Sequence, residues 1–151
     1  MELGLLYSGG KDSTLAALLL DDFYDVTLVT GHFGVTDDWE HAKAAAESVG
    51  FAHERIELDE AAARDAVEKM VADGFPRNGI QAVHEHALER LAAADFDAIA
   101  DGTRRDDRVP TVSRAQAQSL EDRHEVDYIS PLSGFGRGAV DRLVDSALDV
   151  T

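Results

Sequence analysis

The amino-acid sequence predicts an α/β fold, with one doubly wound parallel sheet of five strands in a single domain that spans residues 1–151. Short apolar or β-branched runs alternate with amphipathic segments along the chain, which is the pattern of strand–helix–strand units. Such units cross over in a right-handed sense and place helices on both faces of the sheet. No internal repeat, linker or low-complexity stretch divides the chain, and its length suits one core.

Five strands are expected from the composition of short segments. Leu3–Tyr7 is an apolar run, Asp25–Thr30 is rich in β-branched residues, and Ala52–Leu58 alternates in polarity. Ala98–Ala100 and Val126–Ser130 complete the set. Ligands of parallel sheets bind beyond the carboxyl ends of the strands, where the strand order reverses. If the first and fourth of these strands are neighbours at that point, the polar loops that follow them are expected to face one crevice.

Helices are expected between the strands. In the second helix Trp39, Ala42, Ala46 and Val49 fall on one face, with Gly50 as the C-cap. Residues 75–79 are expected to form a loop before a strongly amphipathic helix. The predicted helices cover residues 12–20, 36 or 37–49, 59–74, 80–94, 113–122 and 138–148.

The chain is strongly acidic, with 30 acidic and 14 basic residues and a net charge of −16. The acidic residues are spread over the whole chain, and the only lysines are Lys11, Lys43 and Lys69. This composition favours a salt-adapted surface of the halophilic type, since at ~1 M salt the Debye length is only ~3 Å. An ordinary acidic protein kept soluble by its charge is the alternative.

Several function classes are excluded by what the sequence lacks. It contains no cysteine, which excludes disulfides, thiolate metal sites and cysteine nucleophiles. No apolar run approaches the ~20 residues of a membrane span, and no secretory signal is recognised, so we expect a cytoplasmic protein with no membrane partner. His84 and His86 lie two positions apart on different helix faces, which argues against a zinc site.

The loop after the first strand has the composition of a phosphate site. Gly9 and Gly10 allow close approach of the backbone to a ligand, and the following helix presents free N–H groups and a positive dipole end. Lys11 adds a positive charge, whereas Asp12 would contact phosphate only through a magnesium ion. A tight strand-to-helix turn with a helix cap is the alternative. Neither G-x-x-x-x-G-K-[ST] nor G-x-G-x-x-G is present.

The segment Ser8-Gly9-Gly10-Lys11-Asp12-Ser13 resembles the SGGxDS signature of the PP-loop, or N-type, ATP pyrophosphatases. That family includes synthetases for GMP, asparagine, argininosuccinate and NAD, and enzymes that thiolate tRNA or form lysidine in it. The resemblance implies an adenine nucleotide alpha hydrolase-like sheet in the order 3-2-1-4-5, with ATP and Mg²⁺ as cofactors. It also implies cleavage of ATP to AMP and pyrophosphate, adenylation of a substrate, and later attack by ammonia, an amine or sulfide.

A second loop, Gly102-Thr103-Arg104-Arg105-Asp106-Asp107, resembles the G-T-N-x-D-D loop of the sulfur-inserting branch. This resemblance implies that Gly102 and Thr103 approach the ribose or α-phosphate, and that Asp106 or Asp107 holds magnesium together with Asp12. Arg104 stands where the pattern has Asn. From the residues alone, a solvated acidic turn and surface ion pairs of the arginines are the alternatives.

Two further segments complete the expected site. Ser130–Arg137 resembles the late S-P-L…K/R segment of the same branch, which implies that Arg137 reaches the terminal phosphates. The end of the second expected strand would lie against the adenine, although a plain turn there is the alternative. The predicted catalytic residues are Lys11, Asp12, Thr103 and Arg137. The predicted nucleotide-binding residues are Tyr7, Ser8, Gly9, Gly10, Lys11, Asp12, Ser13, His32, Phe33, Gly34, Gly102, Thr103 and Arg104.

The substrate is expected to be a small molecule or tRNA, with tRNA base modification as the process that the resemblance indicates. The net charge of −16 opposes a polyanion, so RNA would be bound either locally by a cluster of arginines or by a partner protein. The cluster comprises Arg104, Arg105, Arg108 and Arg114. A homodimer is compatible with the sequence. The alternative to an enzyme is a non-catalytic ATP-binding subunit or nucleotide sensor that works with a partner.

Overall fold

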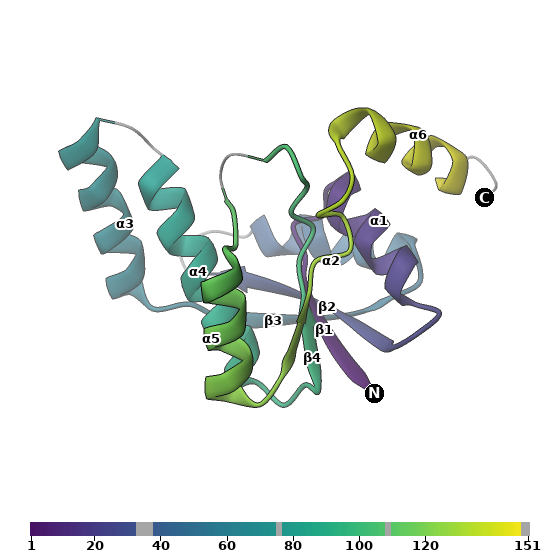
Figure 1. The fold of residues 1–151 in the computed structure, drawn as a ribbon, viewed down its shortest axis with the longest axis horizontal. Helices are drawn as coiled ribbons and strands as arrows, with labels where there is room; N and C mark the ends of the chain where they lie inside the picture. The colour runs from purple at the N-terminus through teal and green to yellow at the C-terminus, as the bar shows by residue number, and fades with distance from the viewer. Residues whose placement is uncertain (33–37, 75–76, 108–109, 149–151) are drawn as a thin grey trace.

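The computed structural model describes residues 1–32, 38–74, 77–107 and 110–148. Five parallel strands form one sheet in the order β3-β2-β1-β4-β5, which confirms the predicted fold class (Figure 1). In the central register Leu5 of β1 lies between Leu28 of β2 and Ala100 of β4. The strands are β1 (Glu2–Leu6), β2 (Asp25–His32), β3 (Ala52–Glu57), β4 (Ala98–Ala100) and β5 (Asp127–Ile129).

Six helices in the described part of the chain connect and follow these strands. They are α1 (Lys11–Leu20), α2 (Asp38–Ser48), α3 (Glu60–Asp73), α4 (Arg77–Ala93), α5 (Arg114–His124) and α6 (Arg137–Leu148). The expected helix cap at residues 36 or 37 lies outside the described residues. Ser113 forms a full capping box with Gln116 at the start of α5, where the sequence predicted a helix to begin.

The start of α4 corrects one prediction. Residues 77–79 were expected in a loop, but α4 already begins at Arg77. A β-carbon at Gly79 would lie 2.6 Å from the carbonyl oxygen of Ala66 and 2.5 Å from the Cε atom of Met70, both in α3. Gly79 therefore lies at a close contact between α3 and α4, where a side chain would not fit, and it serves helix packing instead of breaking the helix.

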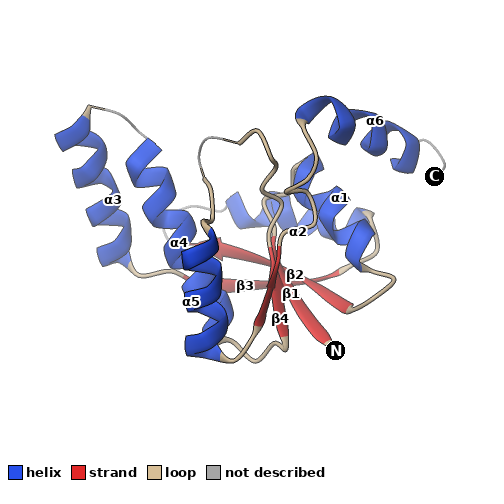
Figure 2. Cartoon of the chain, in the orientation of Figure 1, coloured by secondary structure: helices blue, strands red, loops and turns tan. Residues whose placement is uncertain are grey.

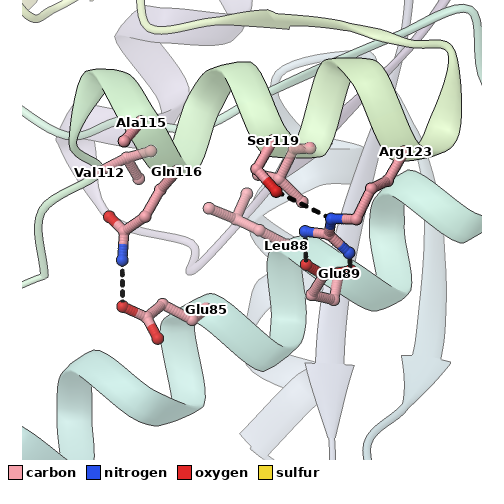
Figure 3. Close-up of a pocket in the computed structure, with 9 residues that line it drawn as sticks. Glu85, Leu88, Glu89, Val112, Ala115, Gln116, Ser119 and Arg123 are labelled. Atoms are coloured by element: carbon pink, nitrogen blue, oxygen red, sulfur yellow. Dashed lines mark hydrogen bonds and ion pairs between the residues drawn. The ribbon is translucent and has the colours of Figure 1, made fainter.

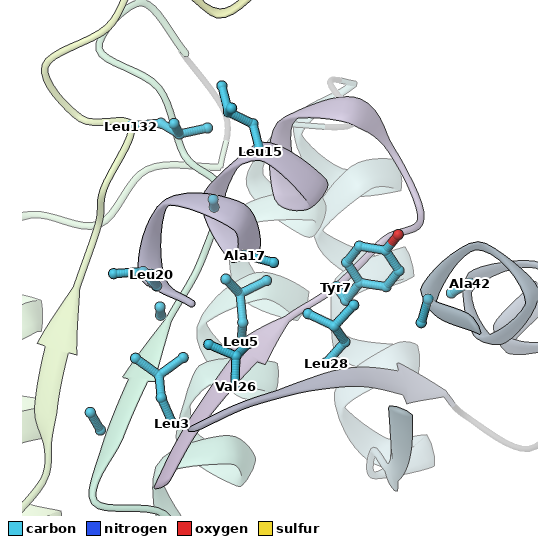
Figure 4. Close-up of a cluster of buried hydrophobic side chains, with 14 of the residues drawn as sticks. Leu3, Leu5, Tyr7, Leu15, Ala17, Leu20, Val26, Leu28, Ala42 and Leu132 are labelled. Carbon is cyan, nitrogen blue, oxygen red and sulfur yellow. The ribbon is translucent and has the colours of Figure 1, made fainter. Parts of the chain in front are cut away.

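The helices cover both faces of the sheet (Figure 2). On one face α1, α2 and α6 pack on a cluster that includes Leu3, Leu5 and Leu28, and Figure 4 shows these side chains beneath α1. On the other face α4 and α5 pack on Val29 and Ile99. Alternate residues of the strands thus point to opposite cores, as expected of a sheet buried on both sides.

The predicted apolar faces of two helices are largely confirmed. Ala42 and Ala46 of α2 are buried, and so are Ala87, Leu88 and Leu91 of α4. Within the described residues, no helix combines the length and the apolar character that crossing a bilayer requires.

Candidate functional site

A cavity of about 460 Å³ lies at the carboxyl ends of β1, β2 and β4. Strands β1 and β4 are neighbours where the order of the sheet reverses, which is where parallel sheets bind ligands. The volume falls within the range of small-molecule sites. Its polar lining residues are Ser8, Asp12, Ser13, Thr30, His84, Asp101, Thr103 and Asp107, and its apolar ones include Leu58, Ile80, Val83 and Ala87.

The loop after β1 forms a tight turn at one side of this cavity. Gly9 has a φ of 84°, and a β-carbon there would lie 3.3 Å from the Cα atom of Ala42 in α2. The hydroxyl of Ser8 accepts a hydrogen bond from the amide of Gly10 at 3.3 Å and lies 3.3 Å from the hydroxyl of Ser13. The turn therefore needs glycine at position 9, and its two serines stabilise it from within.

The N-terminus of α1 opens directly from this turn. Gly10 occupies the N-cap position in an extended conformation and makes no side-chain cap hydrogen bond. The hydroxyl of Thr14 donates to the carbonyl of Gly10 at 2.8 Å and lies 3.0 Å from the hydroxyl of buried Tyr7. Tyr7 thus supports the helix from the core and also lines the cavity. The first-turn amides have no capping side chain, and a helix N-terminus of this kind is chemically suited to an anion.

Lys11 does not line the cavity in this structure. Its ammonium group forms an ion pair with Asp141 of α6, and both side chains are nearly half exposed. The hydrogen bond from Lys11 lowers the pKa of Asp141 below its ordinary value. Lys11 therefore lies at the mouth of the predicted phosphate loop with a carboxylate as its present partner.

The second predicted loop lies against the first. A β-carbon at Gly102 would be 3.0 Å from the amide nitrogen of Ser13 and 3.2 Å from the carbonyl carbon of Asp12. Only glycine permits this approach without a shift of the backbone. The expectation that the loops after β1 and β4 face one crevice is confirmed, since Ser8, Asp12, Gly102 and Thr103 all line the cavity.

The three carboxylates predicted to bind magnesium surround the guanidinium of Arg104. The Nη2 atom of Arg104 lies 2.9 Å from Asp107, and its Nε atom lies 3.4 Å from Asp12 and 3.7 Å from Asp106. The hydrogen bond to Asp107 is the largest cause of a raised pKa of Arg104. Among the described side chains, no group of three or more His, Cys, Asp or Glu is arranged to hold a metal ion.

Two of these carboxylates nevertheless suit a magnesium ion. Asp12 and Asp107 both line the cavity, and the buried Oδ1 atom of Asp12 has no hydrogen-bond partner among the described residues. Oxygen ligands of this kind, together with phosphate oxygens, are the ones that Mg²⁺ prefers. Asp106 has another role here: its Oδ2 atom accepts a hydrogen bond from the amide of Arg137 at 3.0 Å, the largest cause of its lowered pKa.

The segment before α6 packs on the second loop. The amide of Arg105 donates to the carbonyl of Phe135 at 3.1 Å, and a β-carbon at Gly136 would lie 2.9 Å from the guanidinium of Arg105. Arg137 begins α6 beside Asp106. The late segment that the sequence singled out is therefore joined to the predicted site by backbone hydrogen bonds.

A buried polar network at the cavity floor was missed by the sequence reasoning. The Nε2 atom of His84 in α4 lies 2.9 Å from the carboxylate of Asp101, which also accepts a hydrogen bond from the Thr103 hydroxyl at 2.9 Å. That hydroxyl lies 3.0 Å from the hydroxyl of Ser130. The pKa of Tyr128 is raised, chiefly by its burial and secondly by the nearby charge of Asp101. The feature of the sequence that could have indicated this network is the helical spacing of Ile80, Val83, His84 and Ala87.

The end of β2 brings Thr30 and Gly31, which were not predicted, into the lining of the cavity. The ring of the predicted residue His32 lies 6.3 Å from that of Trp39. The hydroxyl of Thr30 donates to the carbonyl of Tyr7 at 2.8 Å, which joins β2 to the phosphate loop. The predicted residues Phe33 and Gly34 lie outside the described residues.

Comparison with known proteins places the chain in a family. Residues 1–151 match the family described as "Family of unknown function (DUF7411)". This chain is a member of the DUF7411 family. It is 43% identical over 137 residues to the uncharacterized protein MJ0690 of Methanocaldococcus jannaschii, a match that covers 90% of this chain and 68% of that protein.

A solved structure is similar to the whole DUF7411 fold. It is the crystal structure of a predicted subunit of tRNA methyltransferase from Methanocaldococcus jannaschii DSM, with 41% sequence identity and a TM-score of 0.91. The similarity covers 96% of this chain and 74% of that one.

A second cavity of this DUF7411 chain, of about 280 Å³, lies between α4 and α5 (Figure 3). Polar side chains pair across it: Arg123 forms an ion pair with Glu89, and Gln116 donates a hydrogen bond to Glu85. The Arg123 hydrogen bond is the largest cause of a lowered pKa of Glu89. None of residues 8–13 and 102–107, which form the two predicted site loops, lines it, so this cavity is a seam between two helices and not part of the candidate site.

Proposed function

We propose that this DUF7411 chain is a PP-loop ATP pyrophosphatase, which binds ATP in the cavity at the strand switch and transfers AMP to a substrate. The observation that carries the proposal is the contact between Gly102 and Ser13, because it brings the second loop onto the uncapped N-terminus of α1. Helix N-termini of this kind attract phosphate. The family resemblance of Ser8–Ser13 adds independent support.

The two halves of the cavity suit the two halves of ATP. Leu58, Ile80 and Val83 form an apolar wall that fits an adenine ring, whereas the turn at Gly9 and the first turn of α1 offer amides to phosphates. Thr103 would lie near the ribose or α-phosphate, and its hydroxyl is already oriented by Asp101. Lys11 would reach the terminal phosphates after it leaves Asp141.

The proposed reaction needs positioning more than acid–base chemistry. A substrate oxygen forms a bond to the α-phosphorus, the bond from that phosphorus to the bridging oxygen breaks, and pyrophosphate leaves with the electron pair. The α1 amides and Lys11 would stabilise the charge on the leaving group. Asp12 and Asp107 would hold a magnesium ion, which neutralises phosphate charge when bound.

We propose that the substrate is a tRNA that undergoes modification and that this chain is one subunit of the modifying enzyme. The structural relative is described as a predicted subunit of tRNA methyltransferase. The net charge of −16 would repel RNA, so we propose that a partner subunit supplies most of the RNA-binding surface. A non-catalytic ATP-binding subunit of such an assembly is the second candidate, and the Lys11–Asp141 ion pair favours it because it withdraws the lysine from the phosphate loop.

Calorimetry with ATP, and with S-adenosylmethionine as the competing adenosine ligand, tests the proposed binding. ATP with Mg²⁺ should bind, and the sulfonium ligand should bind weakly, because the α1 terminus and Lys11 favour an anion. Gly9→Ala should abolish ATP binding. Gly50→Ala is the matched control, because its φ of 81° imposes a similar backbone strain where nothing lies within 4 Å.

Product analysis separates the enzyme from the sensor. Incubation with ATP, Mg²⁺ and tRNA should release pyrophosphate and leave an equal amount of AMP bonded to the tRNA if the chain adenylates its substrate, and AMP should be released only after a nitrogen or sulfur nucleophile is added. ATP binding with no product, in the presence of the purified partner subunit, would favour the non-catalytic subunit. Preferential binding of S-adenosylmethionine would overturn both.

A further inference from the structure

Arg104 occupies the position between the carboxylates that a cation would take. Its Nε and Nη2 atoms lie 3.1 and 2.9 Å from one oxygen of Asp107, and its backbone amide donates to the other oxygen at 2.7 Å. The same Nε atom lies 3.4 Å from Asp12 and 3.7 Å from Asp106. One positive charge therefore stands among three negative ones.

Two of the three carboxylate residues line the cavity. These are Asp12 and Asp107, whereas Asp106 and Arg104 are not lining residues, and the side chain of Arg104 is 18% exposed. Both oxygens of Asp107 are engaged by Arg104, whereas the buried Oδ1 atom of Asp12 has no hydrogen-bond partner among the described residues. A divalent ion that enters from the cavity would contact Asp12 within a few ångströms of a fixed positive charge.

We propose that Arg104 makes divalent-metal binding conditional on the nucleotide: the chain rejects the free ion and accepts it only together with the triphosphate. This inference rests on the proposed function. Repulsion between a guanidinium and a divalent ion is strong in a partly desolvated site, because the Coulomb energy rises as the effective dielectric falls. The phosphates of a bound nucleotide make the net interaction with the divalent ion attractive, because they attract the guanidinium and the ion at once.

The first test is titration of Mn²⁺ alone, followed by electron paramagnetic resonance and calorimetry. The parent should bind Mn²⁺ weakly, and Arg104→Gln should bind it about tenfold tighter, a gain of about 1.4 kcal/mol. Arg104→Lys keeps the charge and should stay close to the parent. Arg105→Gln is the matched control, because this exposed neighbour has the same charge and, in the described structure, forms neither a hydrogen bond nor an ion pair with Asp12 or Asp107.

The second test uses the unmodified chain, so it does not depend on whether a variant folds. Saturating ATP should raise the affinity of the parent for Mn²⁺ by well over tenfold, and Mn²⁺ should raise the affinity for ATP by the same factor. In Arg104→Gln this coupling should shrink, and circular dichroism confirms that the variant is folded.

Three results would overturn the inference. They are tight Mn²⁺ binding by the parent without nucleotide, an affinity of Arg104→Gln no higher than that of Arg105→Gln, or no Mn²⁺ binding by any form with ATP present. Failure of the proposed function looks different: the parent would bind no ATP either with or without a divalent ion, while the titration of Mn²⁺ alone would still report whether Arg104 excludes the ion.

Discussion

The Nε2 atom of His84 lies 2.9 Å from the carboxylate of Asp101, a residue that is only 1% exposed. The pair joins α4 to the end of β4 beneath the candidate site. The same carboxylate accepts the hydroxyl of Thr103, so the histidine indirectly fixes the second loop. A buried carboxylate at this position requires its partners, because an unpaired charge is costly to bury.

His84→Leu should lower the free energy of unfolding by about 2 kcal/mol, because it removes a hydrogen bond to a buried charged group. His84→Gln retains a donor and should lose less. Urea unfolding measures both. His86→Leu, on the same helix, is the control: its Nε2 atom accepts from the amide of Asp59 at 3.1 Å, outside the cavity. Equal losses in the two leucine variants would contradict a special role of the buried pair.

Gly102→Ala should weaken ATP binding by about tenfold, because the new methyl group forces the second loop away from α1 by a fraction of an ångström. Calorimetry measures the affinity, and thermal unfolding checks that the variant is folded. Gly134→Ala is the control, since nothing lies within 4 Å of a β-carbon there. An unchanged affinity in Gly102→Ala would show that the loop contact does not shape the nucleotide site.

Asp141→Asn should strengthen ATP binding a few-fold, because it releases Lys11 and removes a negative charge from the mouth of the phosphate loop. The effect should shrink as salt is raised, since both groups are nearly half exposed. Asp145→Asn, one turn further along α6, changes the same charge away from Lys11 and serves as the control. Weaker binding in Asp141→Asn would mean that the ion pair positions Lys11 for the phosphates.

Glu89→Gln should destabilise the fold at neutral pH and have no effect in acid. The hydrogen bond from Arg123 holds the folded-state pKa of Glu89 below its unfolded value near 4.5. A lowered folded-state pKa contributes stability above the unfolded pKa, and this contribution is lost as the pH falls through the folded-state pKa. Urea midpoints of the parent and Glu89→Gln should therefore converge as the pH is lowered below about 4.5. Midpoints that differ equally at all pH values would contradict this assignment.

The fold was predictable because local patterns carry it. The apolar run that contains Leu3 and Leu5, and the β-branched run around Val26 and Leu28, give buried strands in both the sequence and the structure. The start of α4 was not predictable, because a glycine that breaks helices in isolation is needed at position 79 for contact with α3. That contact exists only in the tertiary structure.

The candidate site was predictable only where one loop contains it. The turn at Gly9 and Gly10 and the approach of Gly102 follow from glycines in polar loops after strands. Partners from distant segments could not be read from the sequence: Lys11 and Asp141 are 130 positions apart. The position of Arg104 among three carboxylates likewise depends on how the loops meet.

The packing of α3 has a consequence for how the molecule unfolds locally. This helix packs chiefly on α4 and projects beyond the sheet (Figure 1). Its side chains Val67 and Val71 are exposed. It can detach without disturbing either apolar layer on the strands. Backbone amides of α3 should therefore exchange their hydrogen for deuterium long before those of β1, as a separate unit of local unfolding.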